Sequence, residues 1–245
     1  MSYHWNWQIF LEPVSTGRGT YLDWLLSGLC WTLAVALVAW VLALALGVVL
    51  GVVLTGRSRV ARWSAIAYCE TFRGVPLLVQ MFLWYFVLPE LLPAGAAHWL
   101  KREMPLPEAA TAALALAAYT ASRIAVLVRA GIESVPRGLR EAGAALGLRG
   151  WATYQSILLP ICLRTMTPTL TSEFMSLVKN TSIALTIGVM ELTAQARAVT
   201  EYTFHGFESF AAATLLYLVI VMIVGQLMRR VEARSRIVGM LTVRT

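Results

Sequence analysis

The sequence predicts an all-α integral membrane protein with about five transmembrane helices. Of its 245 residues, 58% are hydrophobic and only 13% are charged, whereas soluble domains carry about 25% charged residues. No charged residue lies between Asp23 and Arg57, or between Glu208 and Arg229. Each run supplies the roughly 20 residues that a helix needs to cross a bilayer. Basic residues also gather in alternate connections, as they do in multispanning proteins.

The predicted spans follow one another along a single transmembrane domain, residues 24–228. Residues 1–23 are polar and aromatic, which indicates an interfacial segment on the outer face. The spans are expected at residues 24–54, 64–88, 108–128, 165–190 and 210–228. The first is longer than a bilayer requires, so we expect it to tilt or protrude. An external segment at 191–208 can hold a short helix, and residues 229–245 form a basic cytoplasmic tail.

The positions of the basic residues predict the topology. Those after the first, third and fifth spans are Arg57, Arg59, Arg62, Arg129, Arg137, Arg140, Arg149, Arg229, Arg230, Arg234, Arg236 and Arg244. The opposite connections hold only Arg18, Lys101, Arg102 and Arg197. Because basic loops stay in the cytoplasm, we expect an outside amino terminus and a cytoplasmic carboxyl terminus. The net charge of +7 therefore reflects topology, and no nucleic-acid partner is expected.

Two arginines lie within the predicted second and third spans, where ionisable groups are costly and mark candidate functional positions. Arg73 stands three residues after Glu70, so the two share a helix face. They form either an ion pair near the cytoplasmic interface or part of a transport path. Arg123 cannot lose its proton and needs a counter-charge. That partner is either the carboxylate of an anionic substrate or the side chain of Glu173.

The fourth span combines charged and polar residues at helical spacing. Thr169, Glu173, Ser176 and Asn180 make one polar stripe. Such a stripe lines either a water-filled path or a seam between helices. For Glu173 and Lys179 an ion pair, within the chain or between subunits, stands beside substrate contact as an explanation. The cluster at 179–182, which adds Thr181 and Ser182, can open the helix locally, as transporter helices do near the midplane.

The segment Glu141–Pro160, EAGAALGLRGWATYQSILLP, is a compact polar connection between the third and fourth spans. Residues 141–146 can form one short helix, and Gly147 ends it because glycine tolerates the left-handed conformation. A second helix begins near Trp151, and Pro160 marks the turn into the next span. Two short helices lying along the membrane would form a knob for a partner protein. An ordinary interhelical loop is the alternative.

The sequence shows no arrangement of residues for catalysis. The three histidines have no ligand-like neighbours, and no Ser/His/Asp set, paired catalytic carboxylates or glycine-rich phosphate loop is present. We therefore expect a non-catalytic chain with no metal site and no cofactor. A self-sufficient secondary transporter is disfavoured because we find no internal repeat, and because that reading would leave the polar connection unexplained.

Several stretches together resemble a known family. The spacing of Glu141–Pro160 is similar to the coupling loop of ABC-importer permeases. ETFRGVPLLVQ (70–80), VRAGIESVPRG (128–138) and SEFMSLVKNTSIA (172–184) resemble the polar-amino-acid branch of type I ABC importers. YTASRIAVLVRAGI (119–132), IGVMELTAQA (187–196), EYTFHGFESFAAATLLY (201–217) and NWQIFLEP (6–13) are similar to permease subunits of glutamate/aspartate importers.

The resemblance implies a permease domain in the bacterial inner membrane that passes acidic L-amino acids inward. Another polar amino acid (glutamine, histidine, arginine or a conjugate) is the alternative substrate. It also implies a homologous permease, two ABC ATPase subunits that use ATP and Mg, and a periplasmic binding protein. The implied ATPase-coupling residues are Glu141, Ala142, Gly143, Leu146, Gly147 and Leu148. The candidate substrate path comprises Arg73, Arg123, Glu173, Ser176, Lys179, Asn180, Thr181 and Ser182.

The chain departs from the family pattern at two positions. Gly143 stands where the family usually has alanine, and glycine should loosen the first coupling helix by up to about 1 kcal/mol. Val126 stands where many members of the branch carry a glutamate, so an acidic partner at that position is in doubt. Arg123, in contrast, matches the subgroup with acidic substrates.

Overall fold

The computed structural model describes residues 4–14, 19–136, 138–139, 141, 145–147, 152 and 159–235. The α-helices are α1 (Tyr21–Thr55), α2 (Arg59–Gly74), α3 (Leu77–Phe82), α4 (Leu88–Leu91), α5 (Ala94–His98), α6 (Pro107–Glu133), α9 (Leu159–Asn180), α10 (Leu192–Thr203) and α11 (Gly206–Ser235). Trp7–Leu11 (η1) and Thr181–Ile187 (η5) are 3₁₀-helices, and Leu83–Val87 (η2) and Trp99–Glu103 (η3) are π-helices. The described part of the chain is thus helical, as predicted.

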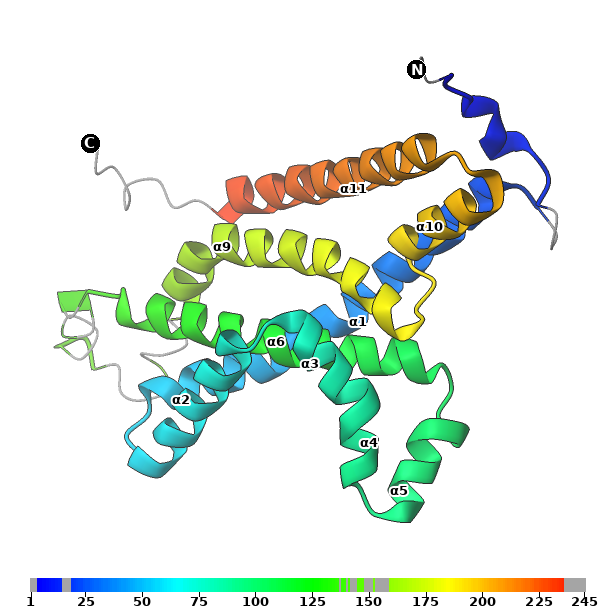
Figure 1. Ribbon diagram of the computed structural model, residues 1–245. Helices are drawn as coiled ribbons and strands as arrows, with labels where there is room; N and C mark the ends of the chain where they lie inside the picture. Colours follow the sequence, from blue (N-terminus) through cyan, green and yellow to red (C-terminus); the bar gives the residue numbers. More distant parts are fainter. Residues whose placement is uncertain are drawn as a thin grey trace.

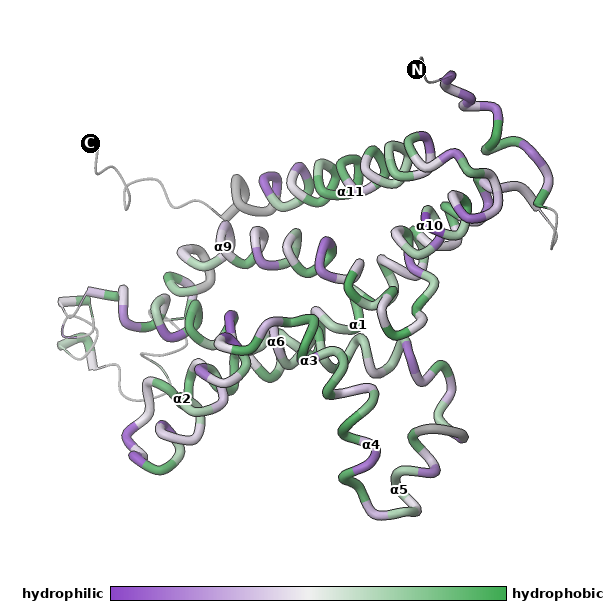
Figure 2. The backbone as a smooth tube through the Cα atoms, in the orientation of Figure 1, coloured by the Kyte–Doolittle hydropathy of each residue, from purple (hydrophilic) through white to green (hydrophobic). Residues whose placement is uncertain are grey.

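Among the described residues, three helices, α1, α6 and α11, are long and apolar enough to cross a membrane, and a fourth span is possible if the bent pair α2 and α3–α4 counts as one. The first, third and fifth predicted spans are therefore confirmed as long apolar helices. Figure 2 shows hydrophobic residues over most of α11, while hydrophilic residues recur along α9. The predicted number of about five spans exceeds these three or four because α9 is more polar than the other long helices.

The second predicted span is not one straight helix. The pair Arg59–Gly74 and Leu77–Leu91 is bent by 104°, so the segment expected to span at 64–88 crosses the membrane only if the two bent parts count as one span. Pro76 lies at the break and lacks the backbone N–H that a continuing helix would use. Gln80 compensates there, because its Nε2 donates to the carbonyl oxygens of Phe72 and Val75, each at 2.7 Å.

The fourth predicted span also changes conformation before its expected end at residue 190. The α-helix ends at Asn180, and 3₁₀ geometry continues from Thr181 to Ile187. Thr181 Oγ1 donates to the Val178 carbonyl and Ser182 Oγ to the Lys179 carbonyl, both at 2.8 Å. Hydroxyl groups that compete for backbone acceptors weaken a helix. The helix therefore changes to the tighter 3₁₀ geometry at this cluster, and an opening at 179–182 that presents backbone groups stays a prediction.

The bundle is held together mainly by close packing of α1 along α6 (Figure 1). A Cβ atom added at Gly47 would lie 2.7 Å from Ile124 and 3.0 Å from the Ala121 carbonyl oxygen. Gly51, one turn later, similarly meets Val128. Small residues let membrane helices approach in this way. α9 packs against α6, α11 packs against α9, and the α4–α5 hairpin projects from the bundle (Figure 1).

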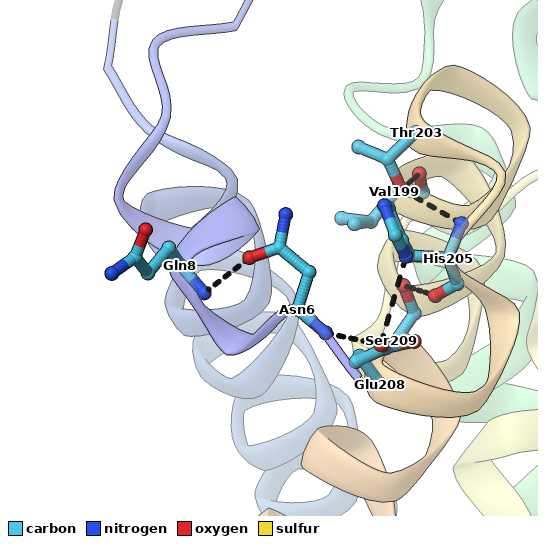
Figure 3. A network of polar contacts seen from close by, with 7 residues as sticks. All are labelled: Asn6, Gln8, Val199, Thr203, His205, Glu208 and Ser209. Atoms are coloured by element: carbon cyan, nitrogen blue, oxygen red, sulfur yellow. Dashed lines mark hydrogen bonds and ion pairs between the residues drawn. The ribbon is translucent and has the colours of Figure 1, made fainter. Parts of the chain in front are cut away.

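The amino-terminal segment lies at the end of the bundle where α10 meets α11 (Figure 1). Helix α10 confirms the short helix that was predicted within 191–208. The carboxylate of Glu208 is fully buried there: its Oε1 accepts a 2.8 Å hydrogen bond from the Asn6 N–H and lies 3.6 Å from His205 Nδ1 (Figure 3). This contact fixes residues 4–14 to the first turn of α11.

Candidate functional site

The central feature of the candidate site is a bidentate ion pair between α6 and α9. Arg123 Nε donates to Glu173 Oε2 at 2.6 Å, and its Nη2 donates to Oε1 at 2.7 Å. The Tyr119 ring centroid lies 6.0 Å from the guanidinium carbon. Of the two partners predicted for Arg123, the structure therefore contains Glu173. Parallel hydrogen bonds of this kind are the strongest form of arginine–carboxylate contact.

The two members of this pair differ in their access to the surroundings. The Glu173 side chain is 11% exposed, whereas that of Arg123 is 42% exposed. A guanidinium carries five N–H donors, and Glu173 accepts two of these hydrogen bonds. Arg123 can therefore bind a second acceptor without releasing the first.

The exposed face of α9 lies beside this pair and is polar. Thr165, Thr169, Ser172 and Lys179 are exposed and Ser176 is half-buried. Their spacing of three or four residues places them on one side of the helix. Of the stripe that the sequence predicts, Thr169, Ser176 and Asn180 stay accessible, while Glu173 turns toward α6. A polar face is unfavourable against lipid tails, so it needs water or a polar partner.

Lys179 stands at the end of this face. It is exposed and forms no ion pair with any residue in the described part of the chain. The predicted pair between Glu173 and Lys179 is therefore wrong within the chain, because the Glu173 carboxylate already receives both hydrogen bonds from Arg123. A pair between Lys179 and another subunit stays a prediction.

Arg73 shows the simpler of its two predicted arrangements. Its Nη1 lies 3.9 Å from Glu70 Oε1, and the two side chains are 46% and 73% exposed. Such an exposed pair on one helix contributes little stability. Arg73 remains accessible on α2, one residue before the helix ends at Gly74.

The two helix breaks lie close to each other in the fold. α3, which follows the break at Pro76, packs against η5, which follows the break at Asn180. Thr181, at the start of η5, is buried and Ser182 is half-buried. Paired breaks of this kind form substrate sites in other transporters, because they leave backbone groups available near the midplane.

The connection between α6 and α9 is described only in part. Glu141 and Leu146 are exposed, Leu146 at 81%. Gly147 has a positive φ of 78°, so the left-handed conformation predicted for this glycine is confirmed. Ala142, Gly143 and Leu148 lie outside the described residues. An exposed leucine beside a glycine turn is available to contact a partner.

Sequence reasoning missed Glu191, a carboxylate that is fully buried. It caps α10: Oε1 accepts from the Ala194 N–H at 2.8 Å, and Oε2 accepts from the Thr193 N–H at 2.9 Å and the Tyr217 hydroxyl at 2.7 Å. Burial raises the pKa of this carboxyl, although these hydrogen bonds oppose the rise. The only local signal was an acidic residue before a helical pattern; the contact with Tyr217 is not visible in the sequence.

Comparison with known proteins identifies the class of protein that this fold and site define. Residues 43–237 match the family described as binding-protein-dependent transport system inner membrane components, and the chain belongs to this family. It is the permease subunit of an amino acid ABC importer, a non-catalytic component of the inner membrane. Transport of this kind implies ATPase subunits and a binding protein as partners. The resemblance stated from the sequence is confirmed at this level.

Individual relatives extend over almost the whole chain. The glutamate/aspartate import permease protein GltJ of Escherichia coli (strain K12) is 41% identical over 241 residues, 98% of each chain. The glutamine transport system permease protein GlnP of the same strain is 33% identical, over 80% of this chain and 88% of its own length.

Solved structures also match the fold. A chain from a crystal structure of an amino acid ABC transporter with histidines has a TM-score of 0.75 and 27% identity, covering 87% of this chain and 95% of its own. An inward-facing structure of the MetNI methionine ABC transporter has a TM-score of 0.71 at 20% identity, covering 88% and 98%. The latter supports the fold alone.

Proposed function

We propose that this permease passes acidic L-amino acids, glutamate and aspartate, inward across the inner membrane. The observation that carries the proposal is Arg123, a cation held by Glu173 yet 42% exposed. The sequence similarity to the glutamate/aspartate permease GltJ supports the same substrate class. An acidic amino acid presents a side-chain carboxylate that a guanidinium recognises in a bidentate manner.

In the proposed mechanism, Glu173 neutralises Arg123 whenever the path is empty, and the substrate carboxylate takes the remaining N–H donors. Two carboxylates then share one cation, which keeps binding weak enough for release. The path comprises Arg73, Arg123, Glu173, Ser176, Lys179, Asn180, Thr181 and Ser182. Its walls are the polar face of α9 and the breaks beside α3. Such a shared site is consistent with a transporter that must bind and release at each cycle.

The proposed assembly pairs this chain with a homologous permease, which covers the polar face of α9. The chain has five spans: α9 with η5 adds one to α1, the bent pair, α6 and α11. Its amino terminus is outside and its carboxyl terminus is cytoplasmic. Residues 1–23 form an interfacial segment, residues 24–228 the permease domain and residues 229–245 the basic tail.

The loop 141–160 contacts an ATPase subunit in the proposed assembly. The contacting residues are Glu141, Ala142, Gly143, Leu146, Gly147 and Leu148. ATP and Mg are used by that partner, and this chain needs no cofactor.

One observation favours a second candidate substrate, a neutral amino acid such as glutamine. The Arg123 guanidinium already has a carboxylate partner in Glu173, so it can serve as a structural group without binding an anion. The similarity to the glutamine permease GlnP is consistent with this alternative.

ATP hydrolysis by the reconstituted importer, with its binding protein present, separates the candidates across a panel of amino acids. Stimulation by glutamate and aspartate alone supports the acidic substrate. Stimulation by glutamine in their place supports the second candidate and leaves Arg123 a structural role. Arg129→Ala is the matched control for variants of Arg123, because Arg129 lies on the same helix and pairs only locally with Glu133 at 2.8 Å.

A further inference from the structure

A groove of about 350 Å³ lies between α9 and α11, and neither Arg123 nor Glu173 lines it. Pro168 and Met175 line it from α9, and Met222, Gly225 and Arg229 line it from α11. Most of this lining is apolar, and the charged side chain lies at the end of α11 nearest the basic tail. Thr171 and Gln226 also line it, so the groove combines a mostly apolar wall with two neutral polar side chains and one cation.

Two residues without ordinary packing side chains open this groove. Pro168 lies inside α9, where a proline removes a helix hydrogen bond and bends the helix. Gly225 leaves the facing surface of α11 bare. A Cβ atom added at Gly225 would lie 3.7 Å from Arg229 Nη1 and 3.8 Å from Met175 Sδ. The guanidinium of Arg229 thus lies back along its own helix, beside Gly225, and lines the groove.

Arg229 is available for a ligand. It is exposed and has no ion pair within the described part of the chain, and Arg230 follows it directly. A basic pocket between transmembrane helices is the kind of site that binds an acidic lipid headgroup. Simple snorkelling of Arg229 to the interface would explain its charge but not the groove beside it.

We infer that this groove binds an anionic phospholipid, with the phosphate on Arg229 and the start of an acyl chain between Met175 and Met222. The charge of Arg229 selects the headgroup, and the thioether side chains adapt to a flexible chain. A transmembrane helix of the partner permease fits less well, because a helix with its side chains is about 10–12 Å across and the groove holds only about 350 Å³. The inference does not depend on which amino acid is transported.

Native mass spectrometry of the delipidated importer complex, supplied with equimolar phosphatidylglycerol and phosphatidylethanolamine, tests the site. We expect the wild type to retain phosphatidylglycerol in preference, and Arg229→Gln to weaken that retention about tenfold, as loss of a charge-assisted hydrogen bond does. Arg62→Gln, which removes an exposed arginine from α2, is the matched control and should bind as the wild type does.

A second variant separates the groove from the charge. Gly225→Leu keeps Arg229 but fills the space between the helices, so phosphatidylglycerol retention should fall while the complex still assembles. Equal retention by wild type, Arg229→Gln and Gly225→Leu would overturn the inference. A loss of association with the partner permease in these variants, without any change in lipid retention, would assign the groove to that subunit instead.

Discussion

Two buried carboxylates, Glu173 on α9 and Glu191 before α10, satisfy their charge in different ways. Glu173 receives both hydrogen bonds from one cation, Arg123, and that cation is 42% exposed. Glu191 is fully buried and receives its hydrogen bonds from two backbone N–H groups and the Tyr217 hydroxyl. The hydrogen-bond donor of Glu173 is therefore accessible to other groups, whereas Glu191 is fully buried among its donors.

This difference distinguishes a candidate binding site, at Arg123 and Glu173, from a structural carboxylate, Glu191. A carboxylate whose donors belong to the backbone can be replaced only by loosening the fold, since those N–H groups have no other acceptor. The Arg123–Glu173 pair instead leaves N–H donors on an accessible guanidinium. Perturbing Glu191 should therefore change stability, and perturbing Arg123 should change transport.

The largest effect is expected for Arg123→Ala. It removes the proposed counter-charge for substrate and leaves the buried Glu173 carboxylate without its cation. Uptake of glutamate into proteoliposomes should fall by about 100-fold or more. Initial rates of labelled uptake measure this, with Arg129→Ala as the control that keeps the wild-type rate.

The double variant Arg123→Met, Glu173→Leu tells the two contributions apart. Replacing both members of an ion pair by apolar residues avoids leaving Glu173 buried without a cation, so the complex should assemble and melt as the wild type does. Uptake should nevertheless stay at the level of Arg123→Ala. If the double variant recovered both uptake and stability, the Arg123–Glu173 pair would be purely structural. It would then not differ in role from Glu191.

Glu191→Ala is expected to have the next largest effect, on stability. The N–H groups of Thr193 and Ala194 and the hydroxyl of Tyr217 lose their acceptor, which corresponds to about 2–4 kcal/mol. The melting temperature of the complex should fall while the KM for substrate is unchanged. Glu201→Ala on the same helix, which removes an exposed partner of Arg197, should leave both quantities close to the wild-type values.

Glu208→Gln sharpens the comparison with a third carboxylate. Glu208 is fully buried and accepts from the Asn6 N–H at 2.8 Å (Figure 3), so it resembles Glu191. The neutral amide keeps an acceptor and loses the charge, and a decrease of about 1 kcal/mol is expected. Limited proteolysis of the amino-terminal segment should accelerate, whereas uptake rates should not change.

The smallest effect concerns the pH dependence of stability. Burial raises the pKa of Glu191 above its ordinary value of 4.5, so the folded chain holds this proton to a higher pH than the unfolded chain. The stability that this group contributes is present below pH 4.5 and is lost as pH rises through the raised pKa. The difference in melting temperature between the wild type and Glu191→Gln, measured over a range of pH, should show this decline. A difference that stays constant with pH would contradict the raised pKa.

The sequence predicted those parts of the fold that depend on local composition. Uncharged runs located α1 and α11, and the span at 108–128 lies within α6. A capping box of Thr20 and Asp23 starts α1 slightly before the predicted residue 24. Hydropathy does not report direction, however, so the 104° bend of the second span near Gly74 and Pro76 could not be predicted from it.

The candidate site was predictable in composition but not in pairing. Arg123 and Glu173 were both identified, and their pairing was one of two alternatives, because a separation of 50 residues gives no information on contact. Glu191 was missed for the same reason: its partner Tyr217 lies 26 residues away. The coupling residues 141–148 and the substrate path keep the status of predictions.

The close packing of Gly47 and Gly51 against α6 restricts how the subunit can move. With Ile124 2.7 Å from a Cβ placed at Gly47, sliding α1 along α6 by one residue would drive larger neighbouring side chains of α1 into the same space. We therefore expect α1 and α6 to move together as one rigid unit. Alternating exposure of the proposed path would then require movement outside the α1–α6 pair.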